Sequence, residues 1–303
     1  MNDGRRILAR LSLLGLSAGD AYGEACFSRD PVEVAARIEA GQVPPGSLRW
    51  TDDTAMAVSV VETLEARGRI DPDDLARRFA LRYAEDPARG YWGGAHAILS
   101  EIARGKDWRA VSRAAFGGTG SWGNGGAMRA APIGAWYAGD PARAASEGAT
   151  SAEPTHAHPE GIDGAAAVAA AAALAAASGR EGTGSFDRDA FFTAVLDVLG
   201  SGRVREGIGK ARVLGDVPAE RAAWSLGSGM AVAAFDTVPF CLWVAARRPS
   251  DYAAALRDAA CGIDRDTTCA IVGGIVALSA PGGVPAAWAR AAEPLPESNK
   301  EAP

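Results

Sequence analysis

Residues 50–67 read WTDDTAMAVSVVETLEAR, and residues 262–280 read GIDRDTTCAIVGGIVALSA. Each stretch places two aspartates and a threonine directly before a run of mostly apolar residues. These runs predict helices at 53–67 and 267–280. Acidic residues near a helix start interact favourably with the helix dipole, and a threonine there can cap free backbone N–H groups. Together the two stretches favour a helical fold.

Helical patterns also dominate the rest of the chain. Asp71-Pro72 predicts a helix start, with Leu75 and Phe79 on one face of that helix. Two-residue alternation typical of strands is almost missing, and segment 43–50 is interrupted by prolines and a glycine. The fold class is therefore predicted to be all-α. Further helices are predicted at 126–138, 160–178 and 227–247, after Asp187, and from Pro249 or Ser250 through Ala260.

No long linker divides the 303 residues. Segment 179–186, GREGTGSF, reads as a polar loop between helices rather than as a domain boundary. Residues 294–303 are polar and contain proline, which predicts a flexible tail. We therefore expect a single all-α domain at 1–293, followed by that tail.

The composition is that of an ordinary globular protein, with 48% hydrophobic residues, 22% charged residues and a net charge of -6. The chain contains no block of lysine and arginine, so we expect no nucleic-acid-binding patch. An acidic protein that binds a phosphorylated ligand must supply positive charge locally. Metal ions, helix N-termini and single arginines can do this.

Two apolar stretches superficially suggest a signal peptide and a membrane span. In the first, Arg10 interrupts the run, and Ile7, Leu11 and Leu14 recur at helical spacing, as on a core-facing stripe. The second, the alanine-rich segment 165–177, is shorter than the roughly 20 residues of a span, so we expect a buried helix. The four cysteines match no zinc spacing and are interpreted as small buried residues of a reducing compartment. These features favour a cytoplasmic protein without membrane contact.

The two acidic clusters predict a metal site if they meet. One cluster contains Asp52 and Asp53, and the other contains Asp264 and Asp266. Residues two apart on a regular helix point about 200° away from each other, so the second pair can converge only on a turn, with Thr267 opening the helix. Carboxylates packed in one pocket raise each other's pKa values unless cations cancel their charge. Two divalent cations would do so, and all-oxygen ligands suit Mg²⁺ or Mn²⁺.

Three further motifs are each weak alone. Residues 15–23, GLSAGDAYG, read as the glycine-punctuated end of the first helix. Residues 117–129, GGTGSWGNGGAMR, could cradle a phosphate on backbone N–H groups or form a flexible surface loop. His156 and His158 could bind a metal, or one could be a satisfied polar residue and the other a loop residue.

Taken together, these segments resemble the ADP-ribosylglycohydrolase family, which includes dinitrogenase-reductase-activating glycohydrolase. The likeness spans residues 7–280. It implies a single-domain orthogonal multi-helix bundle that acts on ADP-ribose or an ADP-ribosylated macromolecule, with a monomer as the default. The reaction implied is metal-dependent hydrolysis of the bond between C1 of the distal ribose and an acceptor. The matching motifs are Gly19-Asp20-Ala21-Tyr22-Gly23, Trp50-Thr51-Asp52-Asp53-Thr54, Gly123-Asn124-Gly125-Gly126-Ala127-Met128-Arg129, Thr155-His156 and Asp264-Arg265-Asp266-Thr267.

The resemblance also implies roles for individual residues. Asp52, Asp53 and Asp264 would act in catalysis, and Trp122 would stack on adenine. The ligands of two Mg²⁺ or Mn²⁺ ions would be Thr51, Asp52, Asp53, Asp264, Asp266 and Thr267. The contacts to ADP-ribose would be Ser121, Trp122, Gly123, Asn124, Gly125 and His156.

Two departures from the family's pattern bear on the substrate. Some members carry a glutamate four residues after the last glycine of the first motif, where this chain has Phe27. Glu24 is the only acid nearby and becomes a candidate catalytic residue. In the last motif a glycine is replaced by Ile263, which stiffens the position. Arg265 adds a cation there, which would meet a phosphate or face solvent.

Two other functions remain open at this point. A catalytically weak ADP-ribose-binding module is permitted by Phe27. A magnesium-dependent isoprenoid-diphosphate enzyme would be all-α with paired aspartates, but it would want a third acid after Asp52-Asp53 and more aromatic residues than 7%.

Overall fold

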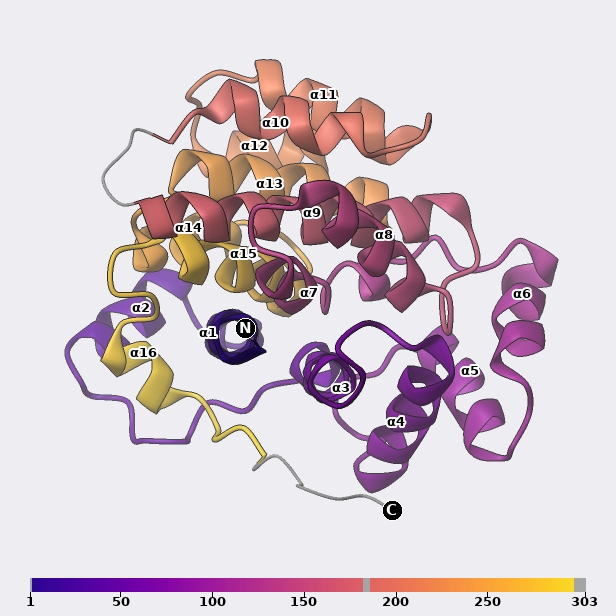
Figure 1. Cartoon of the computed structure of the whole chain (residues 1–303). Helices are drawn as coiled ribbons and strands as arrows, with labels where there is room; N and C mark the ends of the chain where they lie inside the picture. Colours follow the sequence, from indigo (N-terminus) through magenta and orange to yellow (C-terminus); the bar gives the residue numbers. More distant parts are fainter. Residues whose placement is uncertain (1, 182–185, 297–303) are drawn as a thin grey trace.

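The computed structural model describes residues 2–181 and 186–296, and this part of the chain consists of helices without β-strands (Figure 1). The predicted all-α class is confirmed. Residues 182–185 of the predicted polar loop and 297–303 of the predicted tail lie outside the described residues. The helices are α1 (Asn2–Ala25), α2 (Pro31–Glu39), α3 (Asp52–Arg67), α4 (Pro72–Glu85), α5 (Gly93–Ala103), α6 (Trp108–Gly118), η1 (Asn124–Gly126), α7 (Ala131–Trp136), α8 (Pro141–Ala152), α9 (Pro159–Glu181), α10 (Arg188–Asp197), α11 (Arg203–Val213), α12 (Ala219–Leu226), η2 (Ala234–Asp236), α13 (Val238–Arg247), α14 (Tyr252–Ala259), α15 (Arg265–Ser279) and α16 (Ala286–Ala291).

The central packing contact is a glycine-lined seam between α1 and α15. A Cβ added at Gly15, Gly19 or Gly23 would lie 2.2–2.4 Å from a backbone carbonyl oxygen of α15. The oxygens met along α1 belong in turn to residues 273, 269 and 265, so the two helices run antiparallel with matching four-residue steps. The seam therefore brings the late part of α1 against the start of α15. It also corrects the interpretation of 15–23 as a helix end, because α1 continues through Ala25.

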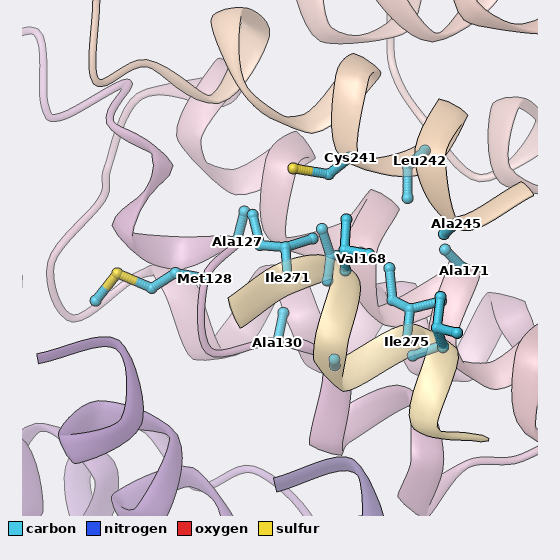
Figure 2. Close-up of a cluster of buried hydrophobic side chains, with 14 of the residues drawn as sticks. Ala127, Met128, Ala130, Val168, Ala171, Cys241, Leu242, Ala245, Ile271 and Ile275 are labelled. Atoms are coloured by element: carbon cyan, nitrogen blue, oxygen red, sulfur yellow. The ribbon is translucent and has the colours of Figure 1, made fainter. Parts of the chain in front are cut away.

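The alanine-rich helix α9 is a core element. Its residues 165–173 are all at most 5% exposed. Figure 2 shows Val168 and Ala171 of α9 gathered with Leu242 of α13 and Ile271 of α15 in one apolar cluster. By length and composition alone, Pro159–Gly179 would suffice to cross a membrane, but 72% of the tested window is buried inside the protein. The expectation of a buried helix at 165–177 is confirmed.

Two predicted helices begin later than expected. Within 126–138, only Ala131–Trp136 is α-helical, and within 227–247, only Val238–Arg247 is. The residues before α13 form a loop because Gly227 and Gly229 adopt φ values of +106° and +85°, which a right-handed helix does not permit. These loops matter because both border the site described below.

A smaller correction concerns the N-cap of α14. Asp251, rather than Pro249 or Ser250, caps α14 by accepting a hydrogen bond from the Ala254 N–H at 2.9 Å. Asp71 and Asp187 cap α4 and α10 as predicted.

The prediction of which residues of α1 face the core was also wrong in part. Ile7 is 65% exposed, whereas Ala9, Leu13 and Leu16 are buried, because the seam with α15 fixes which face turns inward. Three cysteines are buried as expected, but Cys261 is only partly buried, in the turn after α14.

Candidate active site

The predicted site residues surround a cavity of about 400 Å³ at the junction of several helix starts. Four aspartates from the beginnings of α3 and α15 line it, and we call them the acidic floor: Asp52, Asp53, Asp264 and Asp266. Thr267 and the segment Ser121–Gly125 line it too, as does His156. The structure thus brings together acidic clusters that lie more than 200 positions apart in the sequence.

Asp20 of α1 ties the acidic floor to the core from below. This carboxylate is fully buried and accepts hydrogen bonds from the N–H and hydroxyl groups of Thr51 and Thr54, at 2.6–3.1 Å. Thr51 is the N-cap of α3, and its Oγ1 lies 3.1 Å from Asp53 Oδ2. Asp20 was missed as a site residue, although it lies in the Gly19–Gly23 motif. The signal available in the sequence was an acidic residue between two glycines, Gly19 and Gly23, at which helices can pack closely.

Asp264 and Asp266 converge because only one of them is helical. Asp264 is the N-cap of α15, with φ -85° and ψ 72°, and Asp266 lies in the first turn. The helix begins at Arg265, two residues earlier than the predicted opening at Thr267. Asp264 Oδ2 accepts a hydrogen bond of 2.7 Å from the Asn124 side-chain amide, which also donates to Thr237 Oγ1 at 3.0 Å. The asparagine of the glycine-rich segment therefore holds a floor carboxylate in place.

Burial and like charge raise the pKa values throughout the acidic floor. Burial, reinforced by the charge of Asp20, raises the pKa of Asp52 to about 7. Burial and the neighbouring carboxylates raise the pKa values of Asp53 and Asp266 well above the ordinary range. Burial also raises the pKa of Asp264, although the hydrogen bond from Asn124 opposes the shift. The floor therefore strongly favours a compensating positive charge.

The donor chemistry of the floor fits a hard cation. Asp53 Oδ1 and Asp266 Oδ1 are buried without a hydrogen-bond partner, and all the candidate ligand atoms are oxygens. Within the described residues, no group of three or more His, Cys, Asp or Glu side chains is arranged to hold a metal ion as it stands. Asp264 Oδ2 is instead engaged by the Asn124 amide, and Asp53 Oδ2 lies 3.1 Å from Thr51 Oγ1. A cation would therefore compete with the Asn124 hydrogen bond.

Arg129 places one buried cation beside the floor. Its side chain is 0% exposed and stacks over the Phe79 ring at 4.4 Å. It donates hydrogen bonds to the Ser151 carbonyl oxygen at 3.0 Å and to Thr155 Oγ1 at 2.8 Å. Burial lowers the pKa of Arg129 to about 9, and the charge of Asp52 opposes that shift. The sequence placed Arg129 in a matching motif but indicated no role for it.

The glycine-rich segment forms the wall above the floor. Ser121 Oγ accepts a hydrogen bond from the Gly123 N–H at 3.1 Å, and the Asn124 N–H donates to the Val232 carbonyl oxygen at 3.2 Å. A Cβ added at Gly123 or Gly125 would lie 3.2–3.3 Å from His156 Nε2. The segment is therefore an anchored wall of the cavity rather than a flexible surface loop.

The mouth of the cavity is apolar and exposed. We call its four large side chains the apolar rim: Trp92, Phe116, Trp122 and Met230, which are 42–73% exposed. Phe116 and Trp122 stack with centroids 6.2 Å apart. Phe116 and Val232 both line the cavity with positive φ, at 53° and 49°, which is costly for residues with a Cβ. Except for Trp122, the rim had no counterpart in the sequence-based site.

Several predicted participants lie elsewhere. Glu24 is exposed and lines a separate cavity, because α1 carries it past the floor, and its catalytic role stays a prediction. Phe27 and Ile263 are 53% and 49% exposed. The Arg265 guanidinium neither faces solvent freely nor reaches the cavity, because it donates a hydrogen bond to the Cys26 carbonyl oxygen. Thr51 does not line the cavity either, but it supports Asp53 from behind.

Comparison with known proteins shows the family of this chain. ADP-ribosylhydrolase ARH3 of Homo sapiens is 32% identical over 95% of this chain and 89% of its own length, and ARH3 of Bos taurus gives the same values. A solved structure named ADP-ribosylglycohydrolase-related protein complex shares the fold, with a TM-score of 0.60 and 23% identity over 95% of this chain and 93% of that chain. The ADP-ribosylglycohydrolase family matches residues 1–300. The chain therefore belongs to the ADP-ribosylglycohydrolase family.

Proposed function

We propose that this protein hydrolyses the glycosidic bond between C1 of the distal ribose of ADP-ribose and an acceptor. As a family member it is a glycosidase-type hydrolase, and its similar relatives are named ADP-ribosylhydrolases. The observation that carries the proposal is the convergence of four aspartates with the Ser121–Gly125 wall around one cavity. Its volume, about 400 Å³, falls within the usual range for small-molecule sites.

We further propose that the reaction depends on two hard divalent cations, Mg²⁺ or Mn²⁺. Counting Asp20, five buried or nearly buried carboxylates face one buried guanidinium, which leaves four negative charges for two such ions to balance. The residues that would hold them are Asp52, Asp53, Asp264, Asp266 and Thr267, which line the cavity, and Thr51, which lies behind Asp53 and would have to turn toward the ions. When bound, the cations would supply Lewis-acid stabilisation of developing negative charge.

The protein's own groups have separable tasks in this proposal. Breaking the C1 bond develops oxocarbenium character, which the floor carboxylates stabilise electrostatically. Among them, Asp52, Asp53 and Asp264 are the groups available to take a proton from the water that attacks C1 or to give one to the leaving group. The backbone N–H groups of Ser121–Gly125 other than those of Gly123 and Asn124, which are bonded within the protein, orient the diphosphate. Trp122 stacks on adenine, and His156 contacts a phosphate or ribose oxygen.

One competing function rests on a specific observation. Neither Phe27 nor Glu24 brings an additional acid to the cavity, which is what a catalytically weak ADP-ribose-binding module would look like. The intact acidic floor favours catalysis over this alternative. An isoprenoid-diphosphate enzyme loses its basis, because the chain belongs to a different family.

The deciding experiment incubates the purified protein with ADP-ribosylated arginine, serine and DNA-base substrates, with and without Mg²⁺ or Mn²⁺. Metal-dependent release of ADP-ribose from one of these linkages supports the proposal and identifies the acceptor. Tight ADP-ribose binding without turnover of any linkage supports the binding module instead. Size-exclusion chromatography and cell fractionation test our accompanying proposal of a cytoplasmic monomer.

A further inference from the structure

Three buried side chains form a hydrogen-bonded relay that runs from beside the acidic floor to the cavity wall. Arg129, Thr155 and His156 are 0%, 3% and 8% exposed. The Arg129 guanidinium donates to Thr155 Oγ1 at 2.8 Å, and Thr155 Oγ1 lies 2.7 Å from His156 Nδ1. The relay is therefore continuous, with a fixed cation at one end and an imidazole at the other.

The number of hydrogens available along this relay decides which ring nitrogen of His156 carries a proton. Arg129 can only donate, so Thr155 Oγ1 accepts that bond and has one hydrogen left to give. The nearest alternative acceptor, the Ala152 carbonyl oxygen, is 3.4 Å away, whereas His156 Nδ1 is at 2.7 Å. The nearby guanidinium charge also disfavours a second N–H dipole pointing toward it. Burial and that same charge lower the pKa of His156 to about 3, so the ring is neutral at pH 7.

We infer that Arg129, acting through Thr155, fixes His156 as the Nε2–H tautomer, and that this N–H is a preset hydrogen-bond donor to an oxygen of the ligand in the cavity. Nε2 has no hydrogen-bond partner in the described part of the chain. It lies beneath Gly123 and Gly125, whose missing side chains leave it open to the ligand. If the tautomer of a neutral imidazole were not fixed, Nε2 could either donate or accept a hydrogen bond. The relay fixes the tautomer in which Nε2 donates.

This inference rests on the proposed function for the identity of the ligand, ADP-ribose, whose diphosphate and ribose oxygens accept hydrogen bonds. Arg129 and Thr155 are positioning residues, because they act through His156. The tautomer itself is a property of the protein alone. It can therefore be measured without assuming any activity.

The first test uses protein labelled with ¹⁵N in its three histidines and long-range ¹H–¹⁵N correlation, which separates pyridine-type from pyrrole-type ring nitrogens. We expect His156 of the wild type to show a pyridine-type Nδ1 and a pyrrole-type Nε2. Thr155→Ser, which keeps the hydroxyl, should retain that pattern, and Thr155→Val, which is nearly isosteric without it, should lose it. His158 is an internal reference, because its Nδ1 accepts a hydrogen bond from the Glu160 N–H at 3.1 Å. A pyrrole-type Nδ1 in the wild type, or an unchanged pattern in Thr155→Val, overturns the inference.

The second test measures ADP-ribose binding by calorimetry in the same variants, after melting curves confirm that each is folded. We expect Thr155→Val to weaken binding about tenfold and Thr155→Ser to stay within about twofold of the wild type. An altered tautomer with unchanged binding overturns the donor role of Nε2–H. If the wild type shows the expected tautomer but binds no ADP-ribose, the relay is supported and the proposed function fails.

Discussion

The acidic floor and the apolar rim border the same cavity but are built in opposite ways. In the floor, Asp52 and Asp53 are buried and Asp264 and Asp266 are partly buried. The position of the floor is fixed by helix starts, by the Asp20 hydrogen bonds and by the α1–α15 seam. The rim is 42–73% exposed, and Phe116 and Trp122 contact chiefly each other and neighbouring rings. The chemistry of this site therefore depends on the core, whereas its contacts with a ligand at the mouth depend on surface residues.

The largest expected effect comes from removing a floor carboxylate. Asp52→Ala and Asp266→Ala should each lower the hydrolysis rate at least about a thousandfold, because charge stabilisation at C1 and the proposed cation ligands are lost together. Both proteins should keep a helical circular dichroism spectrum, since each change removes one of several repelling charges. Asp189→Ala, whose carboxylate lies on the surface beside Arg212, is the matched control and should retain full activity. Wild-type rates in either floor variant would sink the assigned site.

The next largest effect tests how far the floor depends on the seam. Gly19→Ala places a methyl group 2.2 Å from the Cys269 carbonyl oxygen, so α1 must move away from α15 and carry Asp20 with it. We expect a loss of about 3 kcal/mol in the free energy of unfolding, measured by urea denaturation, together with reduced activity. Gly209→Ala in α11 meets no atom within 4 Å and serves as the control, with unchanged or slightly raised stability. Equal stability of the two variants would contradict the proposed role of the seam.

A medium effect should appear in the pH dependence of stability without metal. The pKa of Asp52 is raised to about 7 and that of Asp20 to about 6, from 3.8, so the folded protein binds more protons than the unfolded chain between these values. The stabilisation is complete below about pH 4 and is lost as the pH rises through about 6 to 7.

Urea midpoints of the chelator-treated protein should therefore fall between pH 5 and pH 8, by less in Asp52→Asn than in the wild type. Mn²⁺ or Mg²⁺ should restore the midpoint at pH 8, and at a hundred times the dissociation constant the gain would be about 2.7 kcal/mol. Parallel pH profiles for the wild type and Asp52→Asn, or no response to either cation, would count against the buried charge as the cause.

The smallest effects belong to the apolar rim. Trp122→Ala should weaken ADP-ribose binding about tenfold through lost stacking, and Trp92→Ala by no more than about threefold. Neither should change stability by more than about 0.5 kcal/mol, because both side chains lie at the surface, with Trp92 67% and Trp122 42% exposed. Trp224, which is 88% exposed on α12, provides the control substitution. A loss of folding in Trp122→Ala would contradict this comparison, because it would show that the rim, like the floor, is part of the structural core.

Much of the floor could be predicted from the sequence. Asp52-Asp53 and Asp264 to Thr267 stand out because acids and threonines directly before apolar helical runs are visible in the residue order. The glycine-rich segment and Thr155-His156 are weak motifs alone, but together with the acidic clusters they predict a site for ADP-ribose. The sequence did not show that Glu24 lines a separate cavity, because proximity in sequence to the first motif does not say where a continuing helix carries a side chain.

The helical class, the residue types at the two helix starts and the family follow from the sequence, because local periodicity and motif order are properties of the chain alone. Three placements are visible only in the folded protein: Asp20 supports α3, Arg129 is buried beside the floor, and Arg265 turns toward Cys26. Such placements depend on which helix faces meet, and the close approach of α1 to α15 sets those faces.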